Sequence, residues 1–158
     1  MIDLINKLEK NRTLTLEEYE RLIIGRNEEY ARILAEKALR AKQSVYGNSV
    51  FIRGLIEISN YCKNNCIYCG IRRDNKACER YRLTKEQILS CCDEGYPLGF
   101  RTFVLQGGED PYFTDERICE IVAEIKNRYP DCAVTLSLGE KSRESYQKMF
   151  DSGADRYL

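Results

Sequence analysis

Apolar positions in the first third of the chain recur at the spacing of an α-helix. The apolar residues of the first such segment are Leu4, Ile5 and Leu8, which would share one helix face. Thr15 and Glu18 have the spacing of a capping box and are expected to begin a second helix. Asn27 can cap a third helix that ends near Gly47. The pattern predicts a helical domain over residues 1–47.

The pattern changes after Gly47, where β-rich runs begin to alternate with helical segments. The β-rich runs are Val50–Ser59, Arg101–Gly107, Cys132–Leu138 and the run that begins at Ala154. The helices between them are expected to begin at Thr84, Thr114 and Ser142. This alternation predicts an α/β domain of parallel βα units over residues 48–158. Four such strands fit either a small open sheet or the first half of a (β/α)8 barrel.

Charge and hydropathy exclude several classes of partner. The chain has 25 basic and 25 acidic residues, so it offers no electrostatic reason to bind nucleic acid or an anionic membrane. No apolar run approaches the roughly 18 residues of a membrane span. The first residues are amphipathic and charged and lack the apolar region of a signal peptide. We therefore expect a cytoplasmic protein without a membrane or nucleic-acid partner.

The chain has eight cysteines and no histidine. Without histidine, a metal must be held by sulfur, by carboxylates or by an outside ligand. A disulfide framework is not expected in a chain without a secretion signal. The scattered cysteines, which we expect to be core or partly exposed thiols, are Cys78, Cys91, Cys92, Cys119 and Cys132.

Three clustered cysteines follow the first β-rich run: Cys62, Cys66 and Cys69. A 4Fe-4S cluster takes one ligand on each of four irons, so three thiolates would leave one iron open to an outside molecule. The same spacing also suits a structural zinc site that borrows Cys78 as its fourth ligand. Spacing alone leaves both readings open, and unliganded thiols remain a third.

Two further motifs follow the second and third β-rich runs. Gly107, Gly108 and Glu109 would bring a bare backbone and a carboxylate to a ligand, although such a sequence is also a common turn. Ser137 and Glu140 flank the next loop, which otherwise reads as a helix entry. The carboxyl ends of parallel strands meet at one edge, where α/β folds place ligands. All three motifs are therefore expected on one face.

The spacing of Cys62, Cys66 and Cys69, with Tyr68 before the last cysteine, resembles the signature of the radical S-adenosylmethionine (SAM) superfamily. The Gly-Gly-Glu motif resembles a second signature of that superfamily in place and spacing. From about residue 50 onward the amino-acid sequence is similar to that of the HydE-type maturases of FeFe hydrogenase. The similar stretches are EISNYCKNNCIYCGIRRDN, RYRLT, LQGGEDPY, VTLSLGE and GADRYL. In the IRRDN and LSLGE stretches, the chain is less similar to biotin synthase and methylornithine synthase than to the HydE-type maturases.

The resemblance implies a fold and a set of ligand contacts. It implies the first half of a (β/α)8 barrel, with the three cysteines on a 4Fe-4S cluster and SAM on the fourth iron. Tyr68 would contact the adenine, and Gly107–Glu109 would receive the methionine amino group. Ser137 and Glu140 match positions that face the SAM pocket. The second half of the barrel is expected to be missing, which would leave this chain incompetent by itself.

The resemblance also implies a function. A radical SAM enzyme cleaves SAM reductively to methionine and a 5′-deoxyadenosyl radical. For a HydE-type enzyme this serves assembly of the diiron subcluster of the hydrogenase H-cluster. The expected partners are a small iron-containing or amino-acid-derived substrate, an electron donor such as ferredoxin or flavodoxin, and other maturases. The alternatives are a methylornithine synthase-like or biotin synthase-like enzyme and, in a different class, a four-cysteine zinc-stabilised binding module.

Overall fold

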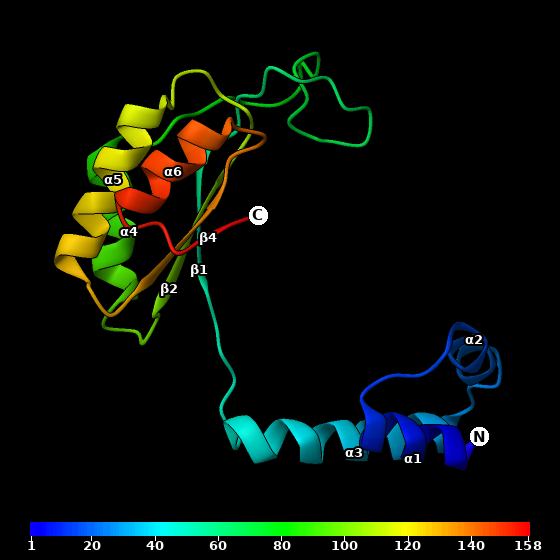
Figure 1. Cartoon of the computed structure of the whole chain (residues 1–158). Coiled ribbons are helices and arrows are strands. Elements are labelled where there is room, and N and C mark those ends of the chain that lie inside the picture. Colours follow the sequence, from blue (N-terminus) through cyan, green and yellow to red (C-terminus); the bar gives the residue numbers. More distant parts are fainter. The chain divides into compact units, whose positions relative to one another are not determined.

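The computed structural model describes residues 1–158 and divides them into two compact units, Met1–Val50 and Phe51–Leu158. Figure 1 shows the course of the whole chain, coloured from the N-terminus to the C-terminus. The proposed domain division at residues 47 and 48 lies close to this boundary. No helix in the structure combines the length and the apolar character that crossing a membrane requires.

The first unit consists of three helices. These are α1 (Ile2–Asn11), α2 (Leu16–Ile24) and α3 (Glu28–Tyr46). The predicted capping box begins α2, because the Glu18 N–H donates to the Thr15 hydroxyl (3.3 Å) while the Thr15 N–H donates to the Glu18 carboxylate (3.0 Å). Asn27 caps α3 by accepting a hydrogen bond from the Tyr30 N–H (2.9 Å). The three helices form as the hydrophobic pattern predicts.

The core of the first unit is small. Its buried residues are Leu4, Ile5, Leu14 and Leu22. Helix α3 contributes no buried residue, only the partly buried Tyr30, Ile33 and Leu34. A unit that packs through so few apolar side chains gains little free energy from burial.

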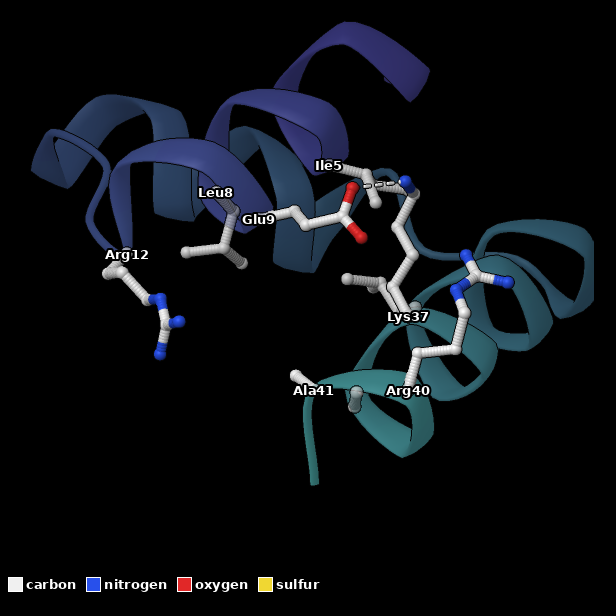
Figure 2. A pocket seen from close by; sticks show the side chains of 9 residues that line it. Ile5, Leu8, Glu9, Arg12, Lys37, Arg40 and Ala41 are labelled. Atoms are coloured by element: carbon white, nitrogen blue, oxygen red, sulfur yellow. Dashed lines mark hydrogen bonds and ion pairs between the residues drawn. The ribbon is translucent and has the colours of Figure 1, made fainter. Parts of the chain in front are cut away.

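A groove of about 580 Å³ lies between α1 and α3 within this unit. Figure 2 shows Ile5 and Leu8 reaching it from α1 and Ala41 from α3, with an ion pair between Glu9 and Lys37 at the rim. The lining contains no cysteine and no group of titratable residues that could carry chemistry beyond this pair and two arginines. This groove is therefore not where the sequence motifs gather.

The second unit alternates strands and helices as predicted. Its elements are β1 (Gly54–Ser59), α4 (Lys85–Gly95), β2 (Thr102–Gly107), α5 (Asp115–Arg128), β3 (Ala133–Ser137), α6 (Arg143–Asp151) and β4 (Arg156–Tyr157). The strands form one sheet in the order β1-β2-β3-β4, and every neighbouring pair is parallel. The structure thus confirms the α/β class and the parallel pairing.

The core of the second unit lies between the sheet and its helices. Figure 1 shows α4, α5 and α6 together on one face of the sheet. The strand residues buried under them include Ile56, Ile58, Phe103, Leu105, Val134 and Leu136. The helix residues that meet them include Ile88, Leu89, Ile118, Val122, Ile125 and Met149. Because side chains alternate along a strand, Leu55 and Glu57 point to the opposite face, where both are exposed.

The strand register brings the ends of β1, β2 and β3 to one edge. Ser59 pairs with Gly107, and Gln106 pairs with Ser137. The segments that follow these three strands carry the three sequence motifs. The fold therefore places the motifs on a common face, as expected from the carboxyl ends of parallel strands.

Candidate functional site

One pocket of about 210 Å³ collects residues from three separate segments. The segment after β1, residues 60–81, is called the cysteine loop here. The pocket residues from this loop are Cys62, Asn64, Cys66, Tyr68, Cys69, Ile71 and Arg72. The residues that complete it are Gly107, Gly108 and Glu109 after β2 and Gly139 after β3. The pocket thus joins the cysteine motif and the Gly-Gly-Glu motif.

The three clustered cysteines are free thiols that line one pocket wall. Cys62 and Cys69 are half-buried and Cys66 is exposed. A tight turn, in which the Cys69 N–H donates to the Cys66 carbonyl (3.0 Å), brings the last two close along the chain. No group of three or more thiol or carboxylate side chains is gathered closely enough to hold a single metal ion.

The remaining cysteines lie outside this pocket. Cys78 does not line the pocket, and its sulfur accepts a hydrogen bond from the Asn60 amide (3.6 Å). Cys92 and Cys132 are buried in the core, and burial raises the pKa of the Cys92 thiol to about 12. A thiol that stays protonated is a poor metal ligand. Cys78 and Cys119 are half-buried and Cys91 is exposed.

Two glycines are required by close packing around the pocket. A Cβ at Gly108 would lie 2.1 Å from the Tyr61 carbonyl oxygen and 2.8 Å from the Cys62 Cβ. Gly139 has φ of +78°, and a Cβ there would lie 2.0 Å from the Cγ of Glu109. Gly108 therefore lets the β2 loop touch the start of the cysteine loop. Gly139 leaves room for the Glu109 side chain.

Glu109 ties the β2 loop to the cysteine loop. Its carboxylate accepts a hydrogen bond from the Asn64 amide (2.6 Å) and pairs with the Lys63 ammonium (3.0 Å). Its carbonyl accepts the Lys63 N–H (3.0 Å). The carboxylate is therefore held at the pocket wall in a setting that already accommodates an ammonium group.

An ion pair between the buried Asp110 carboxylate and the partly exposed Arg82 connects the segments around the pocket. The carboxylate of Asp110 is bound by the Arg82 guanidinium at two points (2.7 and 2.9 Å) and by the Ser59 hydroxyl (2.6 Å). Arg82 also lies over the ring of Tyr61, 3.9 Å from its centroid. Burial alone would raise the pKa of Asp110, but the hydrogen bonds from Arg82, Ser59 and the Tyr112 N–H hold that pKa below its ordinary value. This network joins the end of β1, the exit of the cysteine loop and the β2 loop.

Asp110→Asn is expected to destabilise the second unit by about 2 kcal/mol at pH 7, because it removes the charge that pairs with a partly buried arginine. A carboxyl with a lowered folded-state pKa contributes stability above its unfolded pKa of about 3.9, and this contribution is lost as the pH falls through the folded value. The difference between wild type and Asp110→Asn should therefore shrink below about pH 4. Urea unfolding between pH 3 and 7 measures it, and a difference that stays constant over this range would contradict the pairing.

Among the other residues singled out in the sequence, the structure separates two from the pocket. Ser137 ends β3 and is half-buried, and Glu140 is exposed; neither lines the pocket, whereas Gly139 between them does. Tyr68 lines the pocket but is 91% exposed. The proposed roles of these three side chains toward SAM stay predictions.

Sequence reasoning missed several residues that build the site. These are Asn64, Arg80, Arg82, Asp110 and Gly139. Their hydrogen bonds and close contacts join segments 28 to 51 residues apart in several cases. One signal was available, because Arg80 and Arg82 fall within the RYRLT stretch that follows the cysteines.

The comparisons with known proteins agree on a family. The model of the radical SAM superfamily matches residues 56–158. Among curated proteins, the [FeFe] hydrogenase maturase subunit HydE of Thermotoga maritima is 43% identical over 156 residues, which cover 99% of this chain and 44% of that protein. The 3-methylornithine synthase of Methanosarcina acetivorans is 33% identical over 131 residues, covering 82% of this chain and 37% of that protein.

Solved structures resemble the fold closely. The crystal structure of methylornithine synthase (PylB) matches with a TM-score of 0.86 and 29% identity, over 98% of this chain and 46% of that one. The structure of HydG, a maturase of the [FeFe]-hydrogenase, matches with a TM-score of 0.81 and 26% identity, over 99% of this chain and 36% of that one. The chain thus spans less than half the length of each of these relatives.

These matches identify the type of sheet and the family of the chain. The four parallel βα units correspond to part of a (β/α)8 barrel, which confirms the half-barrel expectation over the open sheet. The matched region contains both the cysteine motif and the Gly-Gly-Glu motif, and the fold brings the two into one pocket. With a family model over residues 56–158, the chain belongs to the radical SAM superfamily.

Proposed function

We propose that Cys62, Cys66 and Cys69 hold a 4Fe-4S cluster and that the iron without a cysteine binds SAM. The observation that carries this proposal is the shared pocket, in which three free thiols face the Gly-Gly-Glu segment of the next strand. Membership of the superfamily implies the use of SAM and an iron–sulfur cluster. When bound, such a cluster would supply the electron that cleaves SAM to methionine and a 5′-deoxyadenosyl radical.

The protein's own part in this reaction is binding and placement. Each of the three cysteines supplies one thiolate, and the absence of any other thiol from the pocket leaves the fourth position to an outside ligand. Gly107 and Gly108 line the pocket in which the ligand would lie, and Gly108 lets the β2 loop pack against the cysteine loop. Glu109 supplies a carboxylate held by Lys63 and Asn64, to which the methionine ammonium group would bind.

Three further side chains are proposed to contact SAM. Tyr68 is on the pocket wall and carries a broad exposed ring, which suits stacking on the adenine. Ser137 and Glu140 flank Gly139, so they would reach SAM only from the rim of the pocket.

The finer proposal is maturation of the FeFe-hydrogenase H-cluster. It is supported by 43% identity to the HydE subunit over nearly the whole chain. The substrate would then be an iron–cyanide–carbonyl–cysteine complex, and the partners would include an electron donor such as ferredoxin or flavodoxin and other maturases. A methylornithine synthase-like activity is the second candidate, because that enzyme gives the TM-score of 0.86. A zinc-stabilised module is the alternative from a different class, and the match to the radical SAM superfamily over residues 56–158 argues against it.

The test of the SAM site is formation of 5′-deoxyadenosine by the anaerobically reconstituted protein at its full natural length. Glu109→Gln keeps the size of the side chain and removes its charge. Loss of one hydrogen bond to a charged group should weaken SAM binding about 10- to 100-fold. The control is Glu116→Gln, an exposed glutamate of α5, which should behave as wild type.

Two results would contradict the assignment. Equal SAM affinity in wild type and Glu109→Gln would remove Glu109 from the site. Absence of 5′-deoxyadenosine from a wild-type protein that has taken up its cluster would remove the proposed reaction. To separate the two candidate functions, the gene can be tested in a host that lacks its own HydE-type maturase. Restored hydrogenase activity supports the maturase, whereas formation of 3-methylornithine without restoration supports the second candidate.

A further inference from the structure

The cysteine loop contains no helix or strand, so its backbone groups need other partners. Four backbone carbonyls of the loop share one hydrogen-bond partner, the side chain of Arg80. The guanidinium of Arg80 donates through Nη1 to the carbonyls of Asn60 and Ile71, the latter at 2.8 Å. Through Nη2 it donates to the carbonyls of Arg72 (2.7 Å) and Asn75 (3.3 Å). A single side chain therefore binds four backbone carbonyls of the cysteine loop. These four hydrogen bonds are called the Arg80 clamp here.

The four carbonyls come from both sides of the cysteine motif. Asn60 lies two residues before Cys62, and Ile71 lies two residues after Cys69. The guanidinium thus bridges the segment that enters the motif and the segment that leaves it. Arginine suits this role because its planar fork presents five N–H donors in fixed directions.

The backbone that carries Arg80 is itself fixed. The side-chain amide of Asn60 donates to the Glu79 carbonyl (2.7 Å) and accepts the Tyr81 N–H (2.8 Å), and these residues flank Arg80 on either side. Asn60, at the start of the cysteine loop, therefore fixes the backbone on both sides of Arg80.

The charge of Arg80 is not neutralised by a carboxylate. Its guanidinium makes hydrogen bonds to neutral carbonyls and forms no ion pair, whereas Arg82, two residues on, is paired with Asp110. A positive charge in a partly buried position acts on its neighbours more strongly than one in open water.

We propose that Arg80 is a positioning residue that holds the cysteine loop in its cluster-binding conformation before any cluster binds, and that its unpaired charge favours the reduced cluster. The second half of this statement rests on the proposed function; the first half concerns the cluster-free chain alone. Reduction adds a negative charge to the cluster. The Arg80 guanidinium binds the carbonyls of Ile71 and Arg72, two residues that line the pocket, so its positive charge would stabilise the reduced cluster and raise the reduction potential.

Hydrogen exchange on the cluster-free protein tests the clamp. The reporters are the Lys63 amide, bonded to the Glu109 carbonyl, and the Arg73 amide, bonded to the Asn64 carbonyl. Arg80→Lys keeps the charge but lacks the fork, so exchange at both amides should accelerate about tenfold or more, equivalent to losing one or two hydrogen bonds. Amides of β2 and β3 should be unchanged.

The matched control is Arg101→Lys. Arg101 also donates to two backbone carbonyls, those of Tyr96 (2.9 Å) and Phe100 (2.8 Å), but in the loop that precedes β2. This variant should leave the reporters as in wild type. Unprotected reporters in the wild-type protein, or equal exchange in wild type and Arg80→Lys, would overturn the clamp whatever the cluster does.

The reduction potential of the reconstituted protein tests whether the positive charge of Arg80 stabilises the reduced cluster. Arg80→Lys should retain a potential near that of wild type, and Arg80→Gln should be shifted to a more negative potential. A purely structural role would shift both variants alike, and this result would refute the electrostatic half. If wild-type protein takes up no cluster at all, the proposed function fails, and the exchange experiment still decides the clamp.

Discussion

Replacing any one of Cys62, Cys66 or Cys69 by alanine is expected to abolish the 4Fe-4S cluster. Each thiolate would be the only protein ligand of one iron, and no other cysteine lines the pocket to replace it. The chain also has no histidine that could substitute. Iron and acid-labile sulfide, measured with the visible spectrum after anaerobic reconstitution, should fall to the level of a protein without a site.

The matched control is Cys78→Ala, which removes a thiol from the same loop. Because Cys78 lies outside the pocket and its sulfur accepts the Asn60 amide, this variant should take up the cluster as wild type does. Cys119→Ala, on α5, is a second control. A cluster that survives Cys62→Ala and disappears in Cys78→Ala would show that the ligand set is wrong.

Gly108→Ala is expected to combine a loss of stability with a loss of the site. The added methyl would lie 2.1 Å from the Tyr61 carbonyl and 2.8 Å from the Cys62 Cβ. Backbone atoms cannot turn aside as a flexible side chain can, so the β2 loop and the cysteine loop must separate. Overpacking of this kind costs about 3 kcal/mol. Urea unfolding measures the stability, and iron content after reconstitution measures the site.

The control for Gly108→Ala is Gly70→Ala, in the cysteine loop itself. No atom lies within 4 Å of a Cβ at Gly70, so the same substitution should be nearly neutral for stability and cluster content. If Gly108→Ala has the stability in urea and the iron content of the wild type, the two loops do not pack against each other as described.

Local chemistry made much of the fold predictable from the sequence. The Thr15–Glu18 capping box forms as its spacing predicts. The alternation of β-rich and helical runs produces four parallel strands, because each apolar strand face needs a layer of helices. Both signals arise from residues close together along the chain. The choice between an open sheet and a partial barrel required the comparison with solved structures.

The convergence of the motifs was also predictable, because parallel strands end at one edge. The residues that hold the pocket together were not. Asp110 meets Ser59 and Arg82 across 51 and 28 residues, and no local pattern encodes such contacts. The requirement for glycine at position 139 depends on where the Glu109 side chain lies, which only the folded chain reveals.

The most direct test of the central claim is the electron paramagnetic resonance spectrum of the reduced, reconstituted protein, recorded with and without SAM. If three cysteines leave one iron open in this pocket, SAM must change the spectrum, and SAM labelled with ¹⁵N in its methionine amino group must show hyperfine coupling to the cluster. A reduced cluster whose spectrum is unchanged by saturating SAM, or a colourless protein with stoichiometric zinc, would contradict the claim.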